Sequence, residues 1–400
     1  MPTFGQRLGV AWKAAIGVFS DASAREAHGM LAGIFPGSVG APPTRGARER
    51  IAAFADMPWL HAVADKVASA FASVEWRVGY YKARGAERAT RMKSVQRAGW
   101  GERTKLIKAL AERGEFVQYE QHPMLDLLDG GNSFMTGLAM RKTTALHFDL
   151  EGEAFWIKER SGLNVPVGAW PIPPNWIMAT PTPQDRRFRV GFRGWQGFIP
   201  DTEILWFQNH DPANPYGRGT GMARALADEL ETGEYAQRFI RQTFFNQARP
   251  DFLIYPKNNA TFNEPERRRL QHDWEAQHQG FWRAFKGRFM TREVGVHEFA
   301  AHDFRHLQMI QLMEYERSTI IQVWGVPLSF LGIIEPGHSR ATMGVERYIF
   351  ARWVLVPRLE AFRAMLQERL APEYDDRLIV DYVSPVEEDK DFELEAARAF

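Results

Sequence analysis

Short β-rich segments broken by proline and glycine fill residues 153–207, and helical patterns lie on both sides of them. Four of these segments have strand character: Ala154–Ile157, Trp176–Met178, Phe188–Phe192 and Glu203–Phe207. Turn residues, and not helices, separate these strands, which favours antiparallel pairing. Strands gathered in one region and helices in others indicate an α+β fold.

Three long helices follow the β-rich region. The first is expected from about Met222 to Gln247, after a glycine-rich turn at Gly217–Gly221. The second, from about Phe304 to Trp324, carries an apolar stripe and ends at a Gly-Val-Pro sequence. The third spans about Ala341 to Leu370, and Pro357 within it predicts a kink or a break.

Shorter elements complete the prediction. We expect Ser133 or Thr136 to cap a helix that runs to about Leu150. Helical spacing in the segment Trp59–Val78 is expected to give way to a strand at Glu75–Tyr81. The other expected helices are His122–Leu128 and Glu264–Gln279, and the other expected strands are Phe252–Tyr255, Arg288–Phe299 and Leu378–Val383.

The charge of the chain is nearly balanced, with 50 Lys and Arg against 49 Asp and Glu. Proteins that wrap DNA tightly usually carry a marked basic excess, so tight wrapping is not expected. Residues 82–113 hold ten basic and three acidic residues, a density that can form a nucleic-acid-binding patch. Because base-stacking aromatic rings are nearly absent there, we favour a solvated loop and an exposed helix. The 13 Trp and 28 Phe indicate a large core or extensive subunit interfaces.

Catalytic and metal-binding patterns are weak. The absence of cysteine excludes disulfides, thiol catalysis and Cys-ligated zinc. His302 and His306 have zinc-ligand spacing on a helix, but no third ligand is evident. We therefore expect no catalytic residue, no metal and no cofactor, and no segment is apolar enough to span a membrane.

The order of several short motifs resembles that of the tailed-bacteriophage portal protein family, from about Met57 to Tyr382. Each motif is weak alone, but their order and spacing together are fairly specific. In chain order they are His122–Leu128, Gly152–Trp156, Pro171–Pro174, Ile199–Asp201, Gly217–Gly221, Phe244–Asn246 with Arg249-Pro250, and Gly325–Pro327 with Leu331-Gly332.

The resemblance implies a portal fold with a mixed α/β wing, a two-helix stem, a small α/β clip, a tunnel loop and a long kinked helix. The implied divisions are an N-terminal arm (1–50), wing (51–222), stem helices (223–247 and 304–325), clip (248–303), tunnel loop (326–343), wing helix and strand (344–382) and the start of a crown (383–400).

The resemblance also implies a function and partners. Twelve copies would form a ring at one capsid vertex of the virion, assembled in the host cytoplasm, with double-stranded DNA passing through its channel. The implied partners are the terminase large subunit, the head-tail adaptor, the major capsid protein and the scaffolding protein. No membrane partner is implied.

Two sets of candidate site residues follow from the resemblance. The tunnel loop would present Ile333, Ile334, Glu335, Pro336, Gly337, His338, Ser339 and Arg340 to DNA. The clip would bind the packaging motor and later the adaptor through Arg267, Arg268, Arg269, Arg283, Lys286 and Arg288.

Two other classes of protein remain open. One is another virion adaptor or a scaffolding protein. The other is a metal-dependent nucleic-acid enzyme that uses carboxylates near the C-terminus: Glu387, Glu388, Asp389 and Asp391. Carboxylates packed together in sequence more often form a solvated face.

Overall fold

A computed structural model describes residues 47–82, 93–192, 194–245, 252–256, 263–265, 268–269, 272, 294–298, 309–334 and 339–386. The chain divides into two compact units. The first unit contains the residues up to Ala227 and those from Ile320 onward, and the second runs from Asp228 to Thr319. Within the described residues, no helix is long and apolar enough to cross a membrane.

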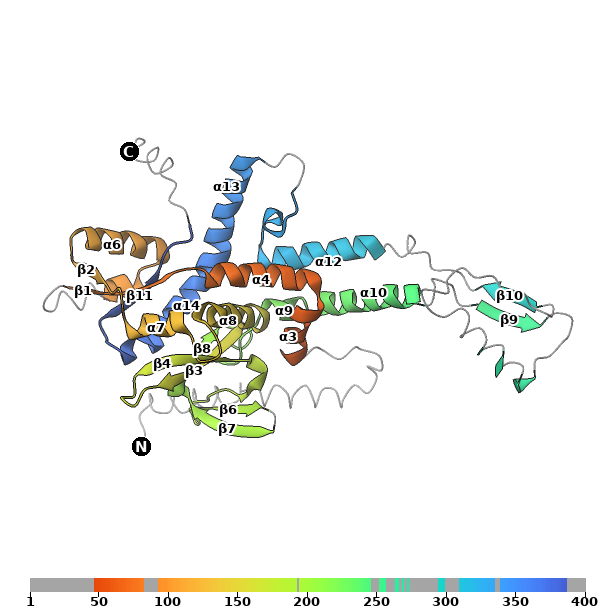
Figure 1. The fold of residues 1–400 in the computed structure, drawn as a ribbon, viewed down its shortest axis with the longest axis horizontal. Helices are drawn as coiled ribbons and strands as arrows, with labels where there is room; N and C mark the ends of the chain where they lie inside the picture. The colour runs from red at the N-terminus through yellow and green to blue at the C-terminus, as the bar shows by residue number, and fades with distance from the viewer. Residues whose placement is uncertain are drawn as a thin grey trace, which may run out of the picture. The chain divides into compact units, whose positions relative to one another are not determined.

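A layer of helices forms the centre of the first unit (Figure 1). It contains α3 (Ala47–Asp56), α4 (Pro58–Ala72), α7 (Pro123–Gly130), α8 (Gly137–Glu151) and α14 (Val356–Arg369). Pro58 occupies the first turn of α4, where its missing N–H costs nothing. Thr136, one of the two expected caps, accepts a hydrogen bond from the Ala139 amide at 3.3 Å and begins α8.

Three antiparallel sheets of three strands each belong to the first unit. Their strands are β1 (Trp76–Tyr81), β2 (Phe116–Gln118), β3 (Glu153–Arg160), β4 (Pro166–Ile172), β5 (Ile177–Ala179), β6 (Arg187–Phe192), β7 (Trp195–Pro200), β8 (Ile204–Gln208) and β11 (Leu378–Tyr382). The sheet orders are β11-β1-β2, β4-β3-β8 and β5-β6-β7. The antiparallel prediction for residues 153–207 is confirmed, but β4 and β7 were not expected.

Aromatic packing joins the helical layer to the β3–β8 sheet. The Phe362 ring on α14 stacks on Phe207 of β8 with 4.1 Å between ring centroids. Its other neighbours include Phe71 on α4 at 4.8 Å and Trp156 on β3 at 6.2 Å. Trp156 is fully buried, and its indole donates to the Thr144 hydroxyl on α8 at 2.7 Å. This core fixes α14, from which the rest of the third long helix extends.

The interpretation of residues 82–113 as a solvated loop and an exposed helix was wrong for one residue. Residue Arg103, on α6 (Trp100–Glu112), is fully buried and not part of a solvated face. Its guanidinium donates to Asp381 of β11 at 2.8 Å and to Glu360 of α14 at 3.0 Å. Although burial opposes ionisation of Glu360, hydrogen bonds from Arg103 and Tyr382 hold its pKa below the ordinary value. The ion pairs explain how a charged side chain can lie in the interior.

The third long helix is continuous but irregular. It consists of α13 (Arg340–Ile349), a π-helical segment η5 (Phe350–Leu355) and α14. Pro357 has no N–H to donate, so the regular hydrogen-bond pattern fails just before it. The Arg358 guanidinium donates to the Val354 carbonyl at 2.7 Å. The expected disturbance at the proline is therefore present as a π-helical segment.

Among the residues that the structure describes, the second unit contains parts of two long helices, a pair of strands and a few further helical residues between positions 264 and 272. It contains α10 (Ala227–Phe245) from Asp228 onward, and α12 (Met309–Trp324) up to Thr319. Strands β9 (Phe252–Pro256) and β10 (Val294–Glu298) pair antiparallel. The expectation of a single helix from Met222 is wrong, because Leu226 separates α9 (Met222–Ala225) from α10.

Candidate functional site

The connection between α12 and α13 turns sharply at two glycines. Gly325 and Gly332 adopt φ values of 67° and 79°, a left-handed conformation that favours glycine. Between them lies a short 3₁₀ helix, η4 (Leu328–Leu331). After Gly332, the Ile334 side chain is 70% exposed. The backbone geometry thus directs an apolar side chain into solvent at the start of the expected tunnel loop.

Three contacts fix the two ends of this connection. The Ser339 hydroxyl accepts from the Thr342 amide at 3.2 Å and caps α13. The Ser329 hydroxyl on η4 donates to the Glu346 carboxylate on α13. The Phe330 and Phe350 rings pack with centroids 4.7 Å apart. The loop therefore starts and ends on elements that contact each other.

A buried ion pair lies below the loop, between α8 and α14. The Arg358 guanidinium donates to the Asp149 carboxylate at 2.8 Å, and the two side chains are 10% and 2% exposed. Burial raises the pKa of Asp149, while the Arg358 guanidinium opposes that effect. The pair therefore joins α8 to α14 inside the first unit.

Only part of the expected tunnel loop lies in the described residues. Ile333 is half-buried, while Ile334 and Ser339 are exposed. Arg340 is the first residue of α13, within one residue of the helix start expected at about Ala341, so the last residues of the division 326–343 are helical. The serine cap explains the earlier helix start. Glu335, Pro336, Gly337 and His338 lie outside the described residues.

The expected docking surface is described at two of its six positions. Arg268 and Arg269 lie in helical residues and are exposed. The Arg268 guanidinium donates to Glu264, one helical turn earlier, at 3.0 Å. Arg267, Arg283, Lys286 and Arg288 lie outside the described residues. The structure therefore leaves the proposed binding role of this surface a prediction.

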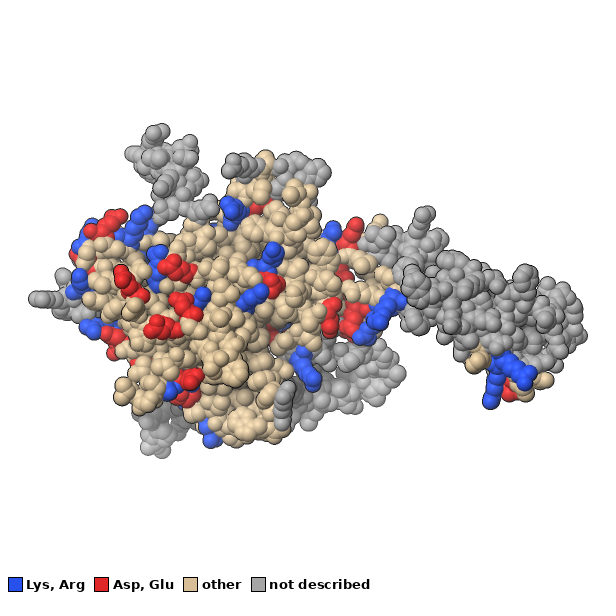
Figure 2. All heavy atoms as spheres, viewed as in Figure 1, with Lys and Arg blue, Asp and Glu red and all other residues tan. Residues whose placement is uncertain are grey.

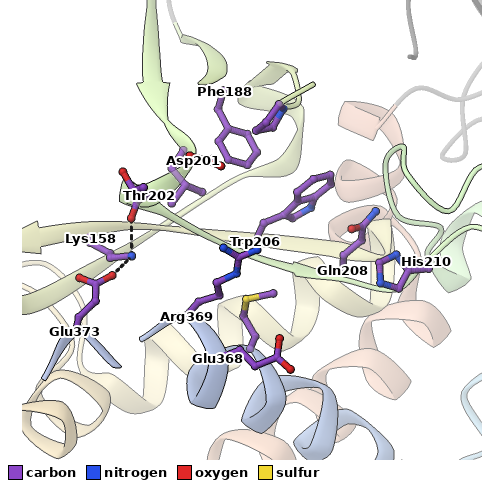
Figure 3. Close-up of a pocket in the computed structure, with 13 residues that line it drawn as sticks. Lys158, Phe188, Asp201, Thr202, Trp206, Gln208, His210, Glu368, Arg369 and Glu373 are labelled. Carbon is purple, nitrogen blue, oxygen red and sulfur yellow. Dashed lines mark hydrogen bonds and ion pairs between the residues drawn. The ribbon is translucent and has the colours of Figure 1, made fainter. Parts of the chain in front are cut away.

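A cavity of about 550 Å³ opens between β8 and α14 in the first unit (Figure 3). Its wall includes the apolar side chains Phe188, Ile204 and Trp206. The Lys158 ammonium donates to the Thr202 carbonyl at 2.6 Å and to the Glu373 carboxylate. Lys158 and Glu373 therefore neutralise each other, and the cavity wall also includes His210, Glu368 and Arg369.

The metal and catalytic patterns of the sequence gain no support. Within the residues that the structure describes, no group of three or more His, Asp or Glu side chains could hold a metal ion. The histidine pair His302 and His306 and the carboxylates from Glu387 to Asp391 lie outside that part of the chain.

An exposed apolar surface on α13 was missed at the sequence level. It consists of Val345, Tyr348, Ile349 and Trp353, which are 42–67% exposed. We call these four residues the α13 stripe. Their i, i+3, i+4, i+8 spacing was a readable signal. The spacing alone, however, predicts a core-facing helix.

The family model described as phage portal protein matches residues 104–395. Among solved structures, the fold is similar to a chain in the neck of an empty GTA particle, with a TM-score of 0.56 and 18% identity, covering 91% of this chain and 92% of that one. It is also similar to an HK97-family phage portal protein from Corynebacterium diphtheriae, with a TM-score of 0.55 and 13% identity, covering 86% and 96%. A third similar chain comes from the neck of a native GTA particle with C12 symmetry, with a TM-score of 0.54 and 15% identity, covering 92% of both chains. No curated protein matches the chain.

Proposed function

The chain belongs to the phage portal protein family, and we propose that twelve copies form a ring at one capsid vertex through which double-stranded DNA enters and leaves. The family match and the α+β architecture confirm the expected family and fold class. The match covers both the candidate loop and the second unit. Membership in this family favours a structural role over an enzymatic one.

The loop between η4 and α13 is the observation that carries the proposed channel role. Its two ends are fixed by the Ser339 cap and by the contact between Ser329 and Glu346. Ile334 is exposed at its start. An apolar contact of this kind can touch a moving duplex without forming an ion pair with a phosphate. This arrangement supports the proposal that the loop borders the DNA.

The charge of the chain supports transport over tight binding. Each phosphate neutralised by Lys or Arg adds affinity and slows sliding. The net formal charge of one chain is only +1. On the visible face of the first unit, acidic and basic side chains are interspersed (Figure 2). Such a surface fits a channel in which DNA moves more than a site at which it stays.

We assign the docking role to the second unit. The terminase large subunit would bind there during packaging, and the head-tail adaptor would replace it afterwards. Arg268 is 77% exposed and its partner Glu264 is 52% exposed. Exposed charges of mixed sign suit a contact that must form and dissociate. In the same proposal, the first unit contacts the major capsid protein and scaffolding protein during assembly in the host cytoplasm.

A shortened loop tests the channel role. Deleting Glu335–His338 keeps the Ser339 cap, so α13 should still form. We expect normal rings and normal capsid precursors, but less DNA per particle, measured by quantifying DNA in purified particles. The control is Leu163→Ala, at a site 88% exposed in the β3–β4 connection.

Full DNA content in particles that carry the deletion would contradict the channel role of the loop. It would leave the family assignment and the ring unaffected. Loss of the ring itself would instead show that the loop is an assembly element, which also contradicts the proposed role.

A further inference from the structure

The cavity between β8 and α14 has an apolar wall large enough to hold a small ligand. Its volume of about 550 Å³ falls within the range of pockets that bind small molecules. Phe188 and Ile204 are buried in this wall, and Trp206 is half-buried. Met365 of α14 is a further apolar residue that lines the cavity. An apolar group that entered would leave water on several sides.

The aromatic part of the wall is held in place by the core. The Trp206 ring stacks on Phe155 with 5.8 Å between ring centroids and meets the Phe188 ring edge-on at 5.7 Å. Phe155 is itself fully buried. Because the core already fixes these rings, a ligand that packs on Trp206 would not have to order them on binding.

Most charges around the cavity are neutralised by a neighbour. The Glu373 carboxylate accepts from the Lys158 ammonium and also from the Arg160 guanidinium, the latter at 2.7 Å. The Asp201 carboxylate accepts from Arg186 at 2.9 Å. These pairs stabilise the wall but offer a ligand little net charge.

Arg369, at the end of α14, is different. Among the residues that the structure describes, its side chain has no hydrogen-bond or ion-pair partner. In Figure 3 its guanidinium points toward Trp206, whereas the carboxylate of the adjacent Glu368 points away. The planar fork of guanidinium donors is therefore available next to an apolar wall.

These two features together select the chemistry of a ligand. A guanidinium matches a carboxylate, with which it can form two parallel hydrogen bonds. A phosphate is less suitable, because it carries nearly two negative charges and the carboxylates of Asp201, Glu368 and Glu373 line the same cavity. A ligand without any charge would leave Arg369 without a partner.

We propose that the cavity binds a ligand with an apolar body and one carboxylate group. The carboxylate pairs with Arg369, and the apolar body packs on Trp206 and Met365. A free aliphatic or aromatic acid has this chemistry, and so does a protein segment in which an acidic residue follows an apolar one. This site lies in the first unit and does not depend on the ring or on the channel role.

A pair of matched probes tests the role of the carboxylate. Phenylbutyrate and its alcohol analogue phenylbutanol share one apolar body and differ in charge. Calorimetry with the purified chain at neutral pH would measure both dissociation constants. We expect the acid to bind at least about fivefold more tightly, because a hydrogen bond to a charged group is stronger than a neutral one. Equal affinities would overturn the proposal.

Arg369→Gln tests the proposed cation. The side chain is exposed, so the fold should be unchanged, and the melting temperature would check this. We expect about fivefold weaker binding of phenylbutyrate and unchanged binding of phenylbutanol. Arg377→Gln is the matched control, since it removes the charge of another exposed arginine that does not line the cavity. Equal losses in the two variants would overturn the proposal, because only net charge would then matter.

A short peptide distinguishes the two sources of the ligand. The probes are acetyl-Leu-Phe-Glu-amide and the same peptide with Gln in place of Glu. Binding of the free acid alone would support a small-molecule site. Binding of the Glu peptide, weakened by Arg369→Gln, would support a docking site for a partner protein. Failure of both the acid and the Glu peptide to bind at millimolar concentration would overturn the proposal and leave the family assignment intact.

Photoaffinity labelling locates the bound acid directly. A diazirine derivative of phenylbutyrate would be activated on the purified chain, and mass spectrometry would map the adducts. We expect adducts on residues that line the cavity, such as Trp206, His210 and Met365. Adducts confined to exposed apolar residues elsewhere, such as the α13 stripe, would overturn the proposal.

Discussion

Arg358 and Asp149 form an ion pair in the interior of the first unit, with 2.8 Å between the guanidinium and carboxylate. We expect Arg358→Met to destabilise this unit by about 3–5 kcal/mol, because it leaves a buried carboxylate without its cation. Urea unfolding followed by tryptophan fluorescence would measure the change.

Arg377→Met is the matched control for that substitution. Arg377 also pairs with an aspartate, Asp375, but its side chain is 55% exposed. We expect a much smaller effect, because water screens the charges of an exposed pair. Equal effects of the two substitutions would mean that the Asp149 pair is not isolated from water.

His147 on α8 provides a test by pH. Burial lowers its pKa from 6.5 to about 4. Below pH 6.5 the unfolded chain takes up a proton that the folded chain refuses, so this histidine lowers stability as the pH falls through that window. Over 2.5 pH units the loss approaches about 3 kcal/mol.

We therefore expect His147→Phe to reduce the loss of stability between pH 7 and pH 4 relative to the wild type. The comparison between the two proteins matters, because buried carboxylates such as Asp149 and Glu153 have raised pKa values and act in the opposite direction. Parallel pH profiles for the two proteins would contradict a buried, neutral His147.

The sequence was least informative about the surroundings of single side chains. Arg103 lies in a strongly basic segment and was expected to be solvated, yet it is fully buried. Its partners Glu360 and Asp381 are more than 250 positions away in the sequence. Local charge density cannot reveal a pairing that only the folded chain creates.

Gly332 and Gly344 have different backbone conformations, so replacing each by alanine should change stability in opposite directions. Gly332 has a φ of 79°, whereas Gly344 lies inside α13, and a Cβ would meet open space at both. We expect Gly332→Ala to destabilise the loop by about 1–2 kcal/mol. Gly344→Ala should stabilise α13 by up to about 1 kcal/mol.

Amide hydrogen exchange of α13 and η4 would measure both substitutions. Because neither added methyl group meets a neighbour, backbone conformation alone decides the sign. Faster exchange in α13 after Gly344→Ala would contradict the helical assignment of this segment.

Helices that have a clear capping residue or a long run of apolar residues at helical spacing were predicted well. The helix after Thr136 and the disturbance at Pro357 are both present, since each depends on residues close in sequence. Strands β4 and β7 were missed. Trp195 and Phe198 of β7 are large and apolar but exposed, so hydrophobicity does not mark which side of the strand is buried.

At the scale of the whole molecule, strand pairing was beyond local patterns. β1 pairs with β11 in a register that sets Trp76 opposite Tyr382. Both segments were expected as strands, but nothing in either indicates its partner. The order of the motifs was more informative than any single strand, because members of one family share the order of their elements. That order indicated the family.

The candidate site was predictable only in outline. The expected loop lies between two helices, with Ile334 exposed, but α13 begins at Arg340 and shortens it. The α13 stripe was missed because helical spacing of apolar residues normally indicates a core. Only the exposed fractions of the side chains separate an interface from a core.

Cryo-electron microscopy of the purified chain would show whether it forms a ring with a central channel. We expect closed rings with an open central channel wide enough for duplex DNA, and twelve copies in the assembly that occupies the capsid. Rings with a neighbouring number of copies in vitro agree with this expectation, because small changes of interface angle alter the count. A chain that stays monomeric at every concentration, and also in the presence of its capsid protein, would contradict it.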